Sequence, residues 1–258
     1  MSDEGEKKKH PPFWRDFGSI IVAILVALVV RTVAAEPFNV PSASMVPTLL
    51  IGDTLIAGKY AYGFSKFSSP LDIVPNTLGD RLSGRILEQP AKRGDVIVFK
   101  LPRDTSINYV KRLIGLPGDR IQVKSGRLYI NGEMLARRED GDFSGELGMR
   151  TRISRRYVET LPGGLEHKII EDSDTAPLDD TTEFTVPPGN YFMMGDNRDN
   201  SLDSRVPAIA GGVGFVPAQN LVGRVDRIMY SRDLDAPWWD LPAIARGFRG
   251  QRFFAAVQ

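Results

Sequence analysis

The 258-residue chain contains no cysteine and only two histidines, and both shortages limit its chemistry. Without cysteine there is no disulfide framework and no thiol nucleophile. His10 lies in the charged N-terminal tail and His167 in a polar, loop-like stretch, so neither is well placed as the base of a Ser-His-Asp triad. A serine nucleophile in this chain therefore needs another base, and a desolvated lysine is the main candidate.

The sequence also lacks the patterns of several other function classes. The net charge is +1 and no basic block stands out beyond Lys7–Lys9, which gives no case for a nucleic-acid partner. There is no Gly-x-Ser-x-Gly elbow, and no lysine lies three residues after a serine. A glycine-rich phosphate loop and a metal-spaced histidine pair are missing too, so we expect neither cofactor nor metal.

One long apolar run is present, at 17–30 near the N-terminus. Its uninterrupted length is typical of a secretory signal, and Val33-Ala34-Ala35 resembles a cleavage site, so a soluble protein with a removable signal is one interpretation. The other is a retained membrane anchor, because Arg31 can snorkel and a helix over 17–35 would be roughly 28 Å long.

The charges around this run favour the anchor and give its orientation. Lys7–Lys9 and Arg15 precede the segment, whereas only Arg31 closely follows it, so the N-terminus should stay in the cytoplasm. We therefore expect a cytoplasmic charged tail at 1–16, one transmembrane helix at 17–35, and the rest of the chain outside the cytoplasm.

Beyond this segment helical periodicity is scarce, and the sequence predicts a mainly β fold. Short β-branched or aromatic runs bounded by Gly, Pro and Asp occur at 54–57, 95–99, 109–114 and 191–194. Between 120 and 132, two further runs are separated by Ser125-Gly126 and followed by Asn131-Gly132, which is typical of consecutive hairpins.

The composition changes between 125 and 187, where charged residues and threonine increase and apolar runs thin out. We interpret 125–187 as a smaller β domain inserted into a larger one formed by 36–124 and 188–235. A C-terminal aromatic and basic segment follows at 236–258. Its aromatic residues, which include Trp238 and Trp239, either lie at a membrane interface or pack on the body of the protein.

Ser44 is the first candidate for chemistry. It lies in the run Pro41–Leu49 (PSASMVPTL), a few residues beyond the end of the apolar segment. A serine among small and turn-forming residues at a membrane boundary indicates a nucleophile that works at the lipid surface.

Lys111 is the second candidate. Period-two alternation in the run 107–113 places it on one face with Ile107, Tyr109 and Leu113. Burial in such an apolar row penalises the ammonium form, and a shift to near neutrality takes roughly 3 pKa units, on the order of 4 kcal/mol. A stem that packs while its head reaches water is the alternative, and alternation leaves both open.

The run Gly195–Arg205 is the third candidate. It is dense in hydroxyls, carboxylates and arginines, and it directly follows an apolar strand. The spacing does not fit an EF-hand calcium loop. A solvated loop and a set of groups that orient an active-site amine are both compatible with it.

Together these runs resemble bacterial type I signal (leader) peptidases. The segments that carry the resemblance occur in the family's order, and it covers about 14–230. They are Ser42–Leu49, Gly94–Phe99, Tyr109–Arg112 with Gly115–Asp119, and Gly195–Arg205. The resemblance implies a β-rich catalytic domain, at 36–124 and 188–235, that carries an inserted β domain.

The resemblance also implies a role for each candidate residue. Ser44 is implied as the nucleophile and Lys111 as the general base, while the Ser42 hydroxyl and the Ser44 backbone N–H form an oxyanion hole. The residues implied to orient or support the lysine amine are Ser201, Gly195, Asp203, Arg205 and Tyr109.

By this resemblance the protein is a membrane-bound serine endopeptidase that removes signal peptides from secretory precursors after Ala-x-Ala-like sites. The implied location is the inner membrane, with a single pass, a cytoplasmic N-terminus and a periplasmic catalytic domain. Its partners are the precursors and the lipid bilayer, and we expect a monomer without cofactor. The single membrane segment departs from those members that have two.

Two other functions compete with this one. The first is a serine/lysine self-cleaving protein of the repressor type, which needs a DNA-binding N-terminus where this chain has an apolar segment. The second is a non-catalytic, envelope-anchored β domain that binds peptides or lipid, in which the serine and the lysine are structural.

Overall fold

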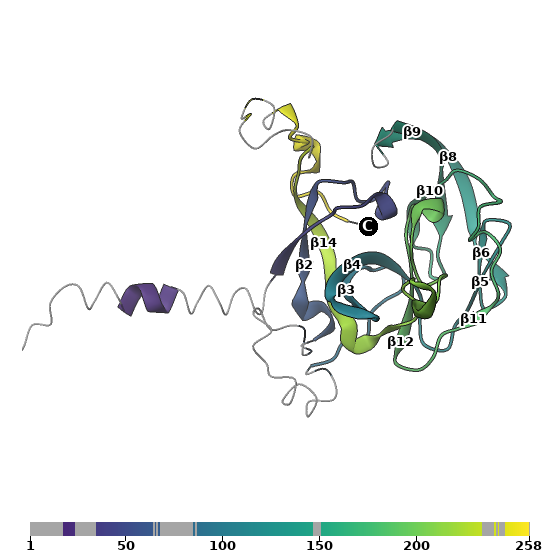
Figure 1. The fold of residues 1–258 in the computed structure, drawn as a ribbon, viewed down its shortest axis with the longest axis horizontal. Helices are drawn as coiled ribbons and strands as arrows, with labels where there is room; N and C mark the ends of the chain where they lie inside the picture. The colour runs from purple at the N-terminus through teal and green to yellow at the C-terminus, as the bar shows by residue number, and fades with distance from the viewer. Residues whose placement is uncertain are drawn as a thin grey trace, which may run out of the picture.

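The fold was analysed in a computed structural model that describes residues 18–23, 35–63, 87–146, 151–233 and 246–257, with residues 65, 67, 85, 240 and 242. These residues form a mainly β structure, as predicted (Figure 1). The strands are β1 (Ala35–Asn39), β2 (Asp53–Gly58), β3 (Val96–Leu101), β4 (Asp104–Gly115), β5 (Arg120–Lys124), β6 (Arg127–Ile130), β7 (Glu133–Met134), β8 (Ala136–Glu146), β9 (Thr151–Thr160), β10 (Glu166–Glu171), β11 (Phe184–Thr185), β12 (Asn190–Met194), β13 (Val216–Pro217) and β14 (Leu221–Ser231). Short 3-10 turns connect them: η1 (Ala43–Met45), η2 (Lys59–Tyr62), η4 (Arg198–Asn200), η5 (Ala208–Ala210), η6 (Ala218–Asn220) and η7 (Gly250–Arg252).

The strands form three antiparallel sheets. The largest has seven strands in the order β1-β2-β14-β3-β4-β12-β13. A three-stranded sheet (β10-β9-β8) and a four-stranded sheet (β11-β5-β6-β7) are built from the part of the chain between β4 and β12. In Figure 1 these smaller sheets lie on one side of the molecule, opposite β2 and β14.

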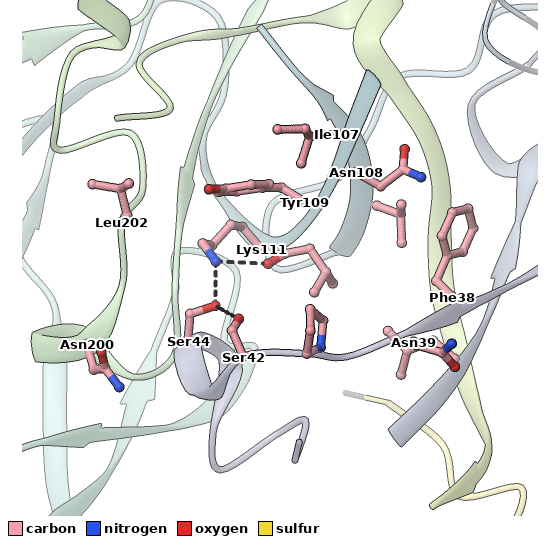
Figure 2. A pocket seen from close by; sticks show the side chains of 14 residues that line it. Phe38, Asn39, Ser42, Ser44, Ile107, Asn108, Tyr109, Lys111, Asn200 and Leu202 are labelled. Atoms are coloured by element: carbon pink, nitrogen blue, oxygen red, sulfur yellow. Dashed lines mark hydrogen bonds between the residues drawn. The ribbon is translucent and has the colours of Figure 1, made fainter. Parts of the chain in front are cut away.

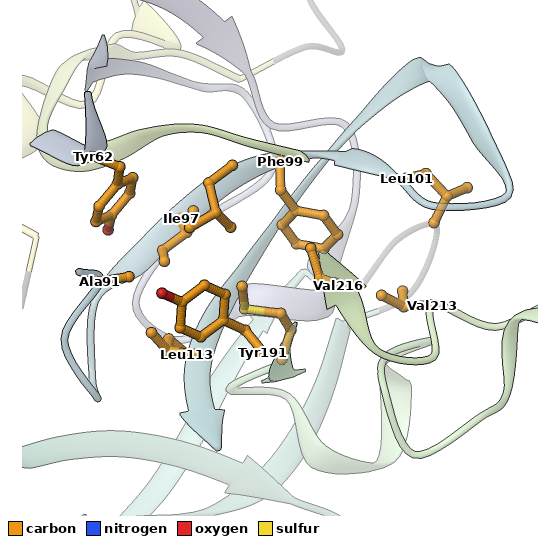
Figure 3. Close-up of a cluster of buried hydrophobic side chains, with 11 residues drawn as sticks. Tyr62, Ala91, Ile97, Phe99, Leu101, Leu113, Tyr191, Val213 and Val216 are labelled. Carbon is orange, nitrogen blue, oxygen red and sulfur yellow. The ribbon is translucent and has the colours of Figure 1, made fainter. Parts of the chain in front are cut away.

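The seven-stranded sheet is buried on both faces. Successive side chains along each strand point to opposite faces, and apolar side chains cover both of them. In β3, Ile97, Phe99 and Leu101 join one apolar cluster, which Figure 3 shows around Leu113 and Tyr191. The intervening residues of β3, Val96 and Val98, join a second cluster on the opposite face. Such double burial explains why β3 reads as a continuous apolar run in the sequence.

The predicted hairpin turns are present around β6. Ser125 and Gly126 have φ values of 47° and 69°, and Asn131 and Gly132 have 56° and 87°. Two successive residues with positive φ are the mark of a type I′ turn, which matches the twist of the flanking strands. These turns direct the apolar side chains of β5 and β6 into a third cluster shared with β4 and β12.

The predicted transmembrane helix falls largely outside the described residues. Residues 18–23 are helical, and no helix in the described part of the chain is long and apolar enough to cross a bilayer. The tail at 1–16 and the pair Trp238-Trp239 also lie outside it. At the C-terminal end, Phe253 and Phe254 are exposed, while Arg252 forms an ion pair with Asp53 at 2.5 Å.

Candidate active site

Ser44 is held in the buried turn η1 by the loop that follows β12. The side-chain amide of Asn197 donates a hydrogen bond to the Ala43 carbonyl at 3.1 Å. The Asn197 backbone N–H donates to the Ser44 carbonyl, also at 3.1 Å. The serine is 7% exposed. Two hydrogen bonds from one residue therefore fix the backbone around Ser44 and present its hydroxyl to the neighbouring strand β4.

Lys111, in β4, points its amine at this hydroxyl (Figure 2). Nζ donates to Ser44 Oγ at 2.5 Å and to the Val110 carbonyl at 3.2 Å. It lies 5.4 Å from the centre of the Tyr109 ring. The side chain is 3% exposed, so the structure has the buried arrangement rather than an amine that reaches water.

Burial also changes the acidity of this amine. It lowers the pKa of Lys111 to about 8, because the ammonium form loses its hydration. Asp203 and Asp196 act in the opposite direction through their charges, and Arg205 acts in the same direction as burial. A substantial fraction of the amine is therefore neutral at mildly alkaline pH.

The Ser42 hydroxyl lies beside the same oxygen. Ser42 Oγ and Ser44 Oγ are 3.3 Å apart, and both side chains face the same pocket in Figure 2. Ser42 is the residue before η1 and has an extended backbone. Its hydroxyl can rotate, so it is available as a donor to a negative oxygen that develops next to Ser44.

Behind the lysine, Asp203 and Arg205 form a buried ion pair. Arg205 Nε and Nη2 donate to the two carboxylate oxygens of Asp203, both at 2.9 Å. The Gly195 N–H also donates to this carboxylate, at 3.1 Å. Burial alone would raise the pKa of Asp203, but Arg205 and these hydrogen bonds hold it below its usual value. Asp203 is therefore an anion at neutral pH.

Gly195 lies in close contact with the serine turn. A Cβ atom at this position would be 2.5 Å from the Ser44 carbonyl oxygen and 2.2 Å from Ser201 Oγ. Real Cβ contacts are not this short, so only glycine fits between these two residues without movement.

Ser201 is 6% exposed, and its placement differs in detail from the expected contact with the lysine. Within the described part of the chain its hydroxyl makes no hydrogen bond, and the bonds of Lys111 Nζ go to Ser44 and Val110. The hydroxyl is near enough to Asp203 to help lower the pKa of that carboxylate. It thus lies beside the Asp203 carboxylate.

Sequence reasoning missed a second buried ion pair next to the serine turn. Arg112 is fully buried, and its Nε and Nη2 donate to the two carboxylate oxygens of Asp196, both at 2.8 Å. The Thr48 hydroxyl donates to the same carboxylate at 2.5 Å. The signal was present: alternation placed Arg112 on the face opposite Lys111, where an arginine between apolar neighbours needs a partner.

The expectation that His167 lies in a loop-like stretch is wrong. It is the second residue of β10, and its side chain is 4% exposed, with Nε2 3.5 Å from Glu159 Oε2. Burial lowers its pKa to about 4, so it is neutral at ordinary pH. Neither ring nitrogen makes a hydrogen bond within the described residues. The alternating pattern of this short strand is hidden in sequence because its neighbours are charged.

Ser44 and Lys111 line an open pocket with a volume of about 410 Å³. One wall comes from β1 and the residues leading to η1, and the other from β4, as Figure 2 shows. Most of the lining is apolar, from Phe38, Leu55, Val98, Ile107, Val110 and Leu202. Among the described residues, the acidic group with spacing suited to a metal is Glu171, Asp179 and Asp199, and none of them lines this pocket.

The two walls share a backbone feature. β1 is the first strand of the large sheet, and only β2 pairs with it among the described strands. In β4, pairing with β12 begins at Arg112, so residues 104–111 have one edge without a described strand partner. The pocket is therefore bordered by strand edges whose N–H and C=O groups can pair with an extended peptide.

Comparisons with known proteins identify the family of the chain. The family model described as signal peptidase, peptidase S26, matches residues 14–230. Signal peptidase I of Rickettsia prowazekii (strain Madrid E) is 40% identical over 88% of this chain and 83% of its own length. Signal peptidase I of Rickettsia massiliae (strain Mtu5) is 39% identical over 93% of this chain and 87% of its own length.

A solved structure of signal peptidase I from Enterococcus faecalis V583 covers 53% of this chain and 97% of that one. Its sequence identity is 29% and its TM-score is 0.31, so the assignment is based on the family model and the sequence relatives. The family model spans most of the residues, and the relatives match nearly the whole chain. The chain is a peptidase and belongs to the signal peptidase I family, peptidase family S26.

Proposed function

We propose that this protein removes N-terminal signal peptides from secretory precursors, with Ser44 as nucleophile and Lys111 as general base. One observation supports this more than any other: a buried amine lies 2.5 Å from a serine hydroxyl at the wall of an open pocket. Membership of the signal peptidase I family supports the choice of substrate.

The proposed reaction begins when neutral Lys111 takes the proton of Ser44. At that stage the 2.5 Å contact has the opposite sense, with the hydroxyl donating to Nζ. The Ser44 oxygen attacks the scissile carbonyl carbon, and the protonated lysine then gives its proton to the departing amine of the mature protein. Lys111 next takes a proton from a water molecule, which attacks the acyl ester, and then returns that proton to the Ser44 oxygen as the ester bond breaks and the signal peptide leaves as a carboxylate.

The negative oxygen that forms during attack would be held by two donors, the Ser44 backbone N–H and the Ser42 hydroxyl. The 3.3 Å separation of the two serine oxygens supports this, because it places the Ser42 hydroxyl beside the reacting centre. A donor aimed at a developing oxyanion is worth about 3 kcal/mol of barrier.

We further propose that the other residues around Lys111 help to keep its amine neutral and oriented toward the Ser44 hydroxyl. Gly195 lets the serine turn approach, while the Asp203–Arg205 pair balances charge beside the amine. Tyr109 covers the lysine with its ring. Ser201 would orient the amine after a small rotation of its hydroxyl, which has no competing hydrogen bond within the described residues.

The substrate would bind as an extended strand between β1 and the free edge of β4. Backbone pairing there supplies affinity without selecting sequence. The lining favours apolar side chains, and on the resemblance to signal peptidases we propose cleavage after Ala-x-Ala-like sites. We also propose that 17–35 is a retained anchor, that 1–16 is cytoplasmic, and that the catalytic domain at 36–124 and 188–235 lies on the periplasmic side with 125–187 inserted in it.

The test is digestion of a purified precursor by the full chain in detergent, with both products identified by mass spectrometry. We expect one cut after an Ala-x-Ala sequence. Ser44→Ala should give no product, and neither should Lys111→Arg, because a guanidinium does not lose its proton at working pH.

Matched controls are available on the surface. Ser144→Ala and Lys124→Arg change exposed residues of the same types outside the pocket and outside the proposed substrate edge, and both should cleave normally. Near-normal turnover by either active-site variant would contradict the dyad. Binding of the precursor without any cleavage by the wild type would instead indicate a peptide-binding β domain.

A further inference from the structure

A cluster of three carboxylates lies outside the pocket, where the loop after β12 meets the three-stranded sheet. Glu171 is the last residue of β10, Asp199 is in η4, and Asp179 is in the segment between β10 and β11. One carboxylate oxygen from each residue lies within 4.8 Å of the other two. The proposed mechanism uses none of these three side chains.

The carboxylates are oriented by backbone groups that leave oxygen atoms free. Asp179 accepts a hydrogen bond from the Ala176 N–H through Oδ2, and Asp199 accepts two N–H groups through its Oδ2. Oδ1 of both residues is buried and has no hydrogen-bond partner in the described part of the chain. Asp179 is 1% exposed, so its free oxygen is shielded from bulk water.

The arginine side chains near the cluster already form ion pairs. Arg137 forms an ion pair with Glu171 and a second one, at 2.9 Å, with Asp174. Arg198 donates to both carboxylate oxygens of Glu159. Glu171 thus shares its guanidinium with Asp174, and neither Asp179 nor Asp199 forms an ion pair within the described residues. Burial of carboxylates without full compensation costs several kcal/mol, which a bound cation would offset.

We propose that Glu171, Asp179 and Asp199 bind a divalent cation, and that calcium is the ion this site fits. Calcium binds oxygen ligands at about 2.4 Å, so two ligands on one ion lie up to about 4.8 Å apart. Carboxylates without histidine or cysteine favour a hard cation over zinc. Water completes the coordination, since Asp199 is only partly buried.

The bound ion would join two parts of the molecule. Asp199 lies in the loop between Gly195 and Ser201, whereas Glu171 belongs to the three-stranded sheet. With three protein ligands we expect a dissociation constant of about 10⁻⁴–10⁻³ M, in the range of extracellular calcium modules. A tenfold excess of calcium over this constant should raise Tm by about 3–5 °C.

Terbium luminescence tests the site directly, using the full chain in detergent at about pH 8. The Tyr157 ring packs on Arg137, at 4.1 Å, and Arg137 in turn contacts Glu171, so this tyrosine can sensitise a terbium ion in the cluster. We expect saturable luminescence that calcium displaces, together with the rise in Tm. The matched control Asp142→Asn, an exposed carboxylate on β8, should behave like the wild type.

Asp179→Asn should lose the luminescence and the calcium-dependent rise in Tm, and without calcium it should be at least as stable as the wild type because repulsion is relieved. If this variant does not fold, Asp199→Asn, which keeps the acceptor for both N–H groups, serves instead. A wild-type Tm independent of calcium, or an unchanged calcium response in these variants, would overturn the proposal. Displacement of terbium by magnesium but not by calcium would overturn the assignment of the ion.

Discussion

Lys111 is nearly inaccessible to water, and among the described residues no carboxylate lies within ion-pairing distance of its amine. The two buried anions nearby, Asp196 and Asp203, are each held by an arginine. Their charge therefore opposes the effect of burial only in part, and the lysine pKa falls to about 8. A shift of this size corresponds to about 3 kcal/mol that disfavours folding below pH 8. The protein thus loses stability at this single residue, as the proposed role of Lys111 as a base would require.

Ser42 offers a test of the oxyanion hole at the same scale. Replacing Ser42 with alanine removes a donor but leaves Lys111 and its surroundings in place, so kcat should fall about 10²–10³-fold. The dependence of the rate on pH should keep the same midpoint, because the environment of the base is unchanged. Steady-state kinetics over a pH series measures both quantities, with Ser144→Ala as the control on an exposed serine outside the pocket. An unchanged kcat would exclude Ser42 from the oxyanion hole.

At the scale of elements, the loop after β12 is the structural centre of the site. It holds η1 through Asn197, contacts the lysine region through Asp203, and pairs with β10 through a bridge between Ile170 and Asn197. It also carries Arg198, whose side chain forms a buried ion pair with Glu159 of β9. The three-stranded sheet is thereby connected to the loop after β12 by buried charges and by backbone pairing.

His167 makes this connection sensitive to acid. Its folded-state pKa of about 4 is below the reference value of 6.5, so the unfolded chain binds a proton that the folded chain excludes. The contribution of His167 to the unfolding free energy is fully present above pH 6.5 and is lost as the pH falls toward 4. Between pH 7 and pH 5 this residue should cost about 2 kcal/mol of unfolding free energy.

Urea unfolding of the full chain in detergent at these two pH values measures the effect. His167→Leu removes the titrating ring and keeps apolar volume, so the variant should lack this part of the pH dependence. Glu171, whose pKa burial raises to about 7, also titrates in this window, but it is present in both proteins and therefore cancels in the difference between wild type and variant. If wild type and variant lose the same free energy between pH 7 and pH 5, His167 is not the cause.

How far the sequence predicted these elements depends on the kind of signal. Alternation and turn residues predicted β3, β4 and the hairpin around Ser125-Gly126, because burial and positive φ restrict residue choice strongly. The partners of Arg112 and the burial of His167 were not predicted. Arg112 meets Asp196 in the loop after β12. His167 of β10 is buried beside Glu159, and β10 also pairs with that loop, so both features depend on tertiary contacts that no local pattern records.

At the scale of the whole molecule, the large sheet brings distant segments to one place. Ser44 and Lys111 are 67 positions apart, and they meet because β1 and β4 border the same pocket on the seven-stranded sheet. The order of the motifs predicted that the two residues would meet, but it did not predict the course of the chain between them. The four-stranded sheet packs against the large one through the third apolar cluster, and the predicted anchor lies largely outside the described residues.

The pH dependence of kcat/KM for cleavage of a precursor by the full chain tests the central claim most directly. If neutral Lys111 is the base, kcat/KM should rise about tenfold per pH unit on the acid side and level off above an apparent pKa near 8. A kcat/KM that stays constant from about pH 6 to about pH 9 would contradict the account, because the fraction of neutral lysine changes greatly over that range.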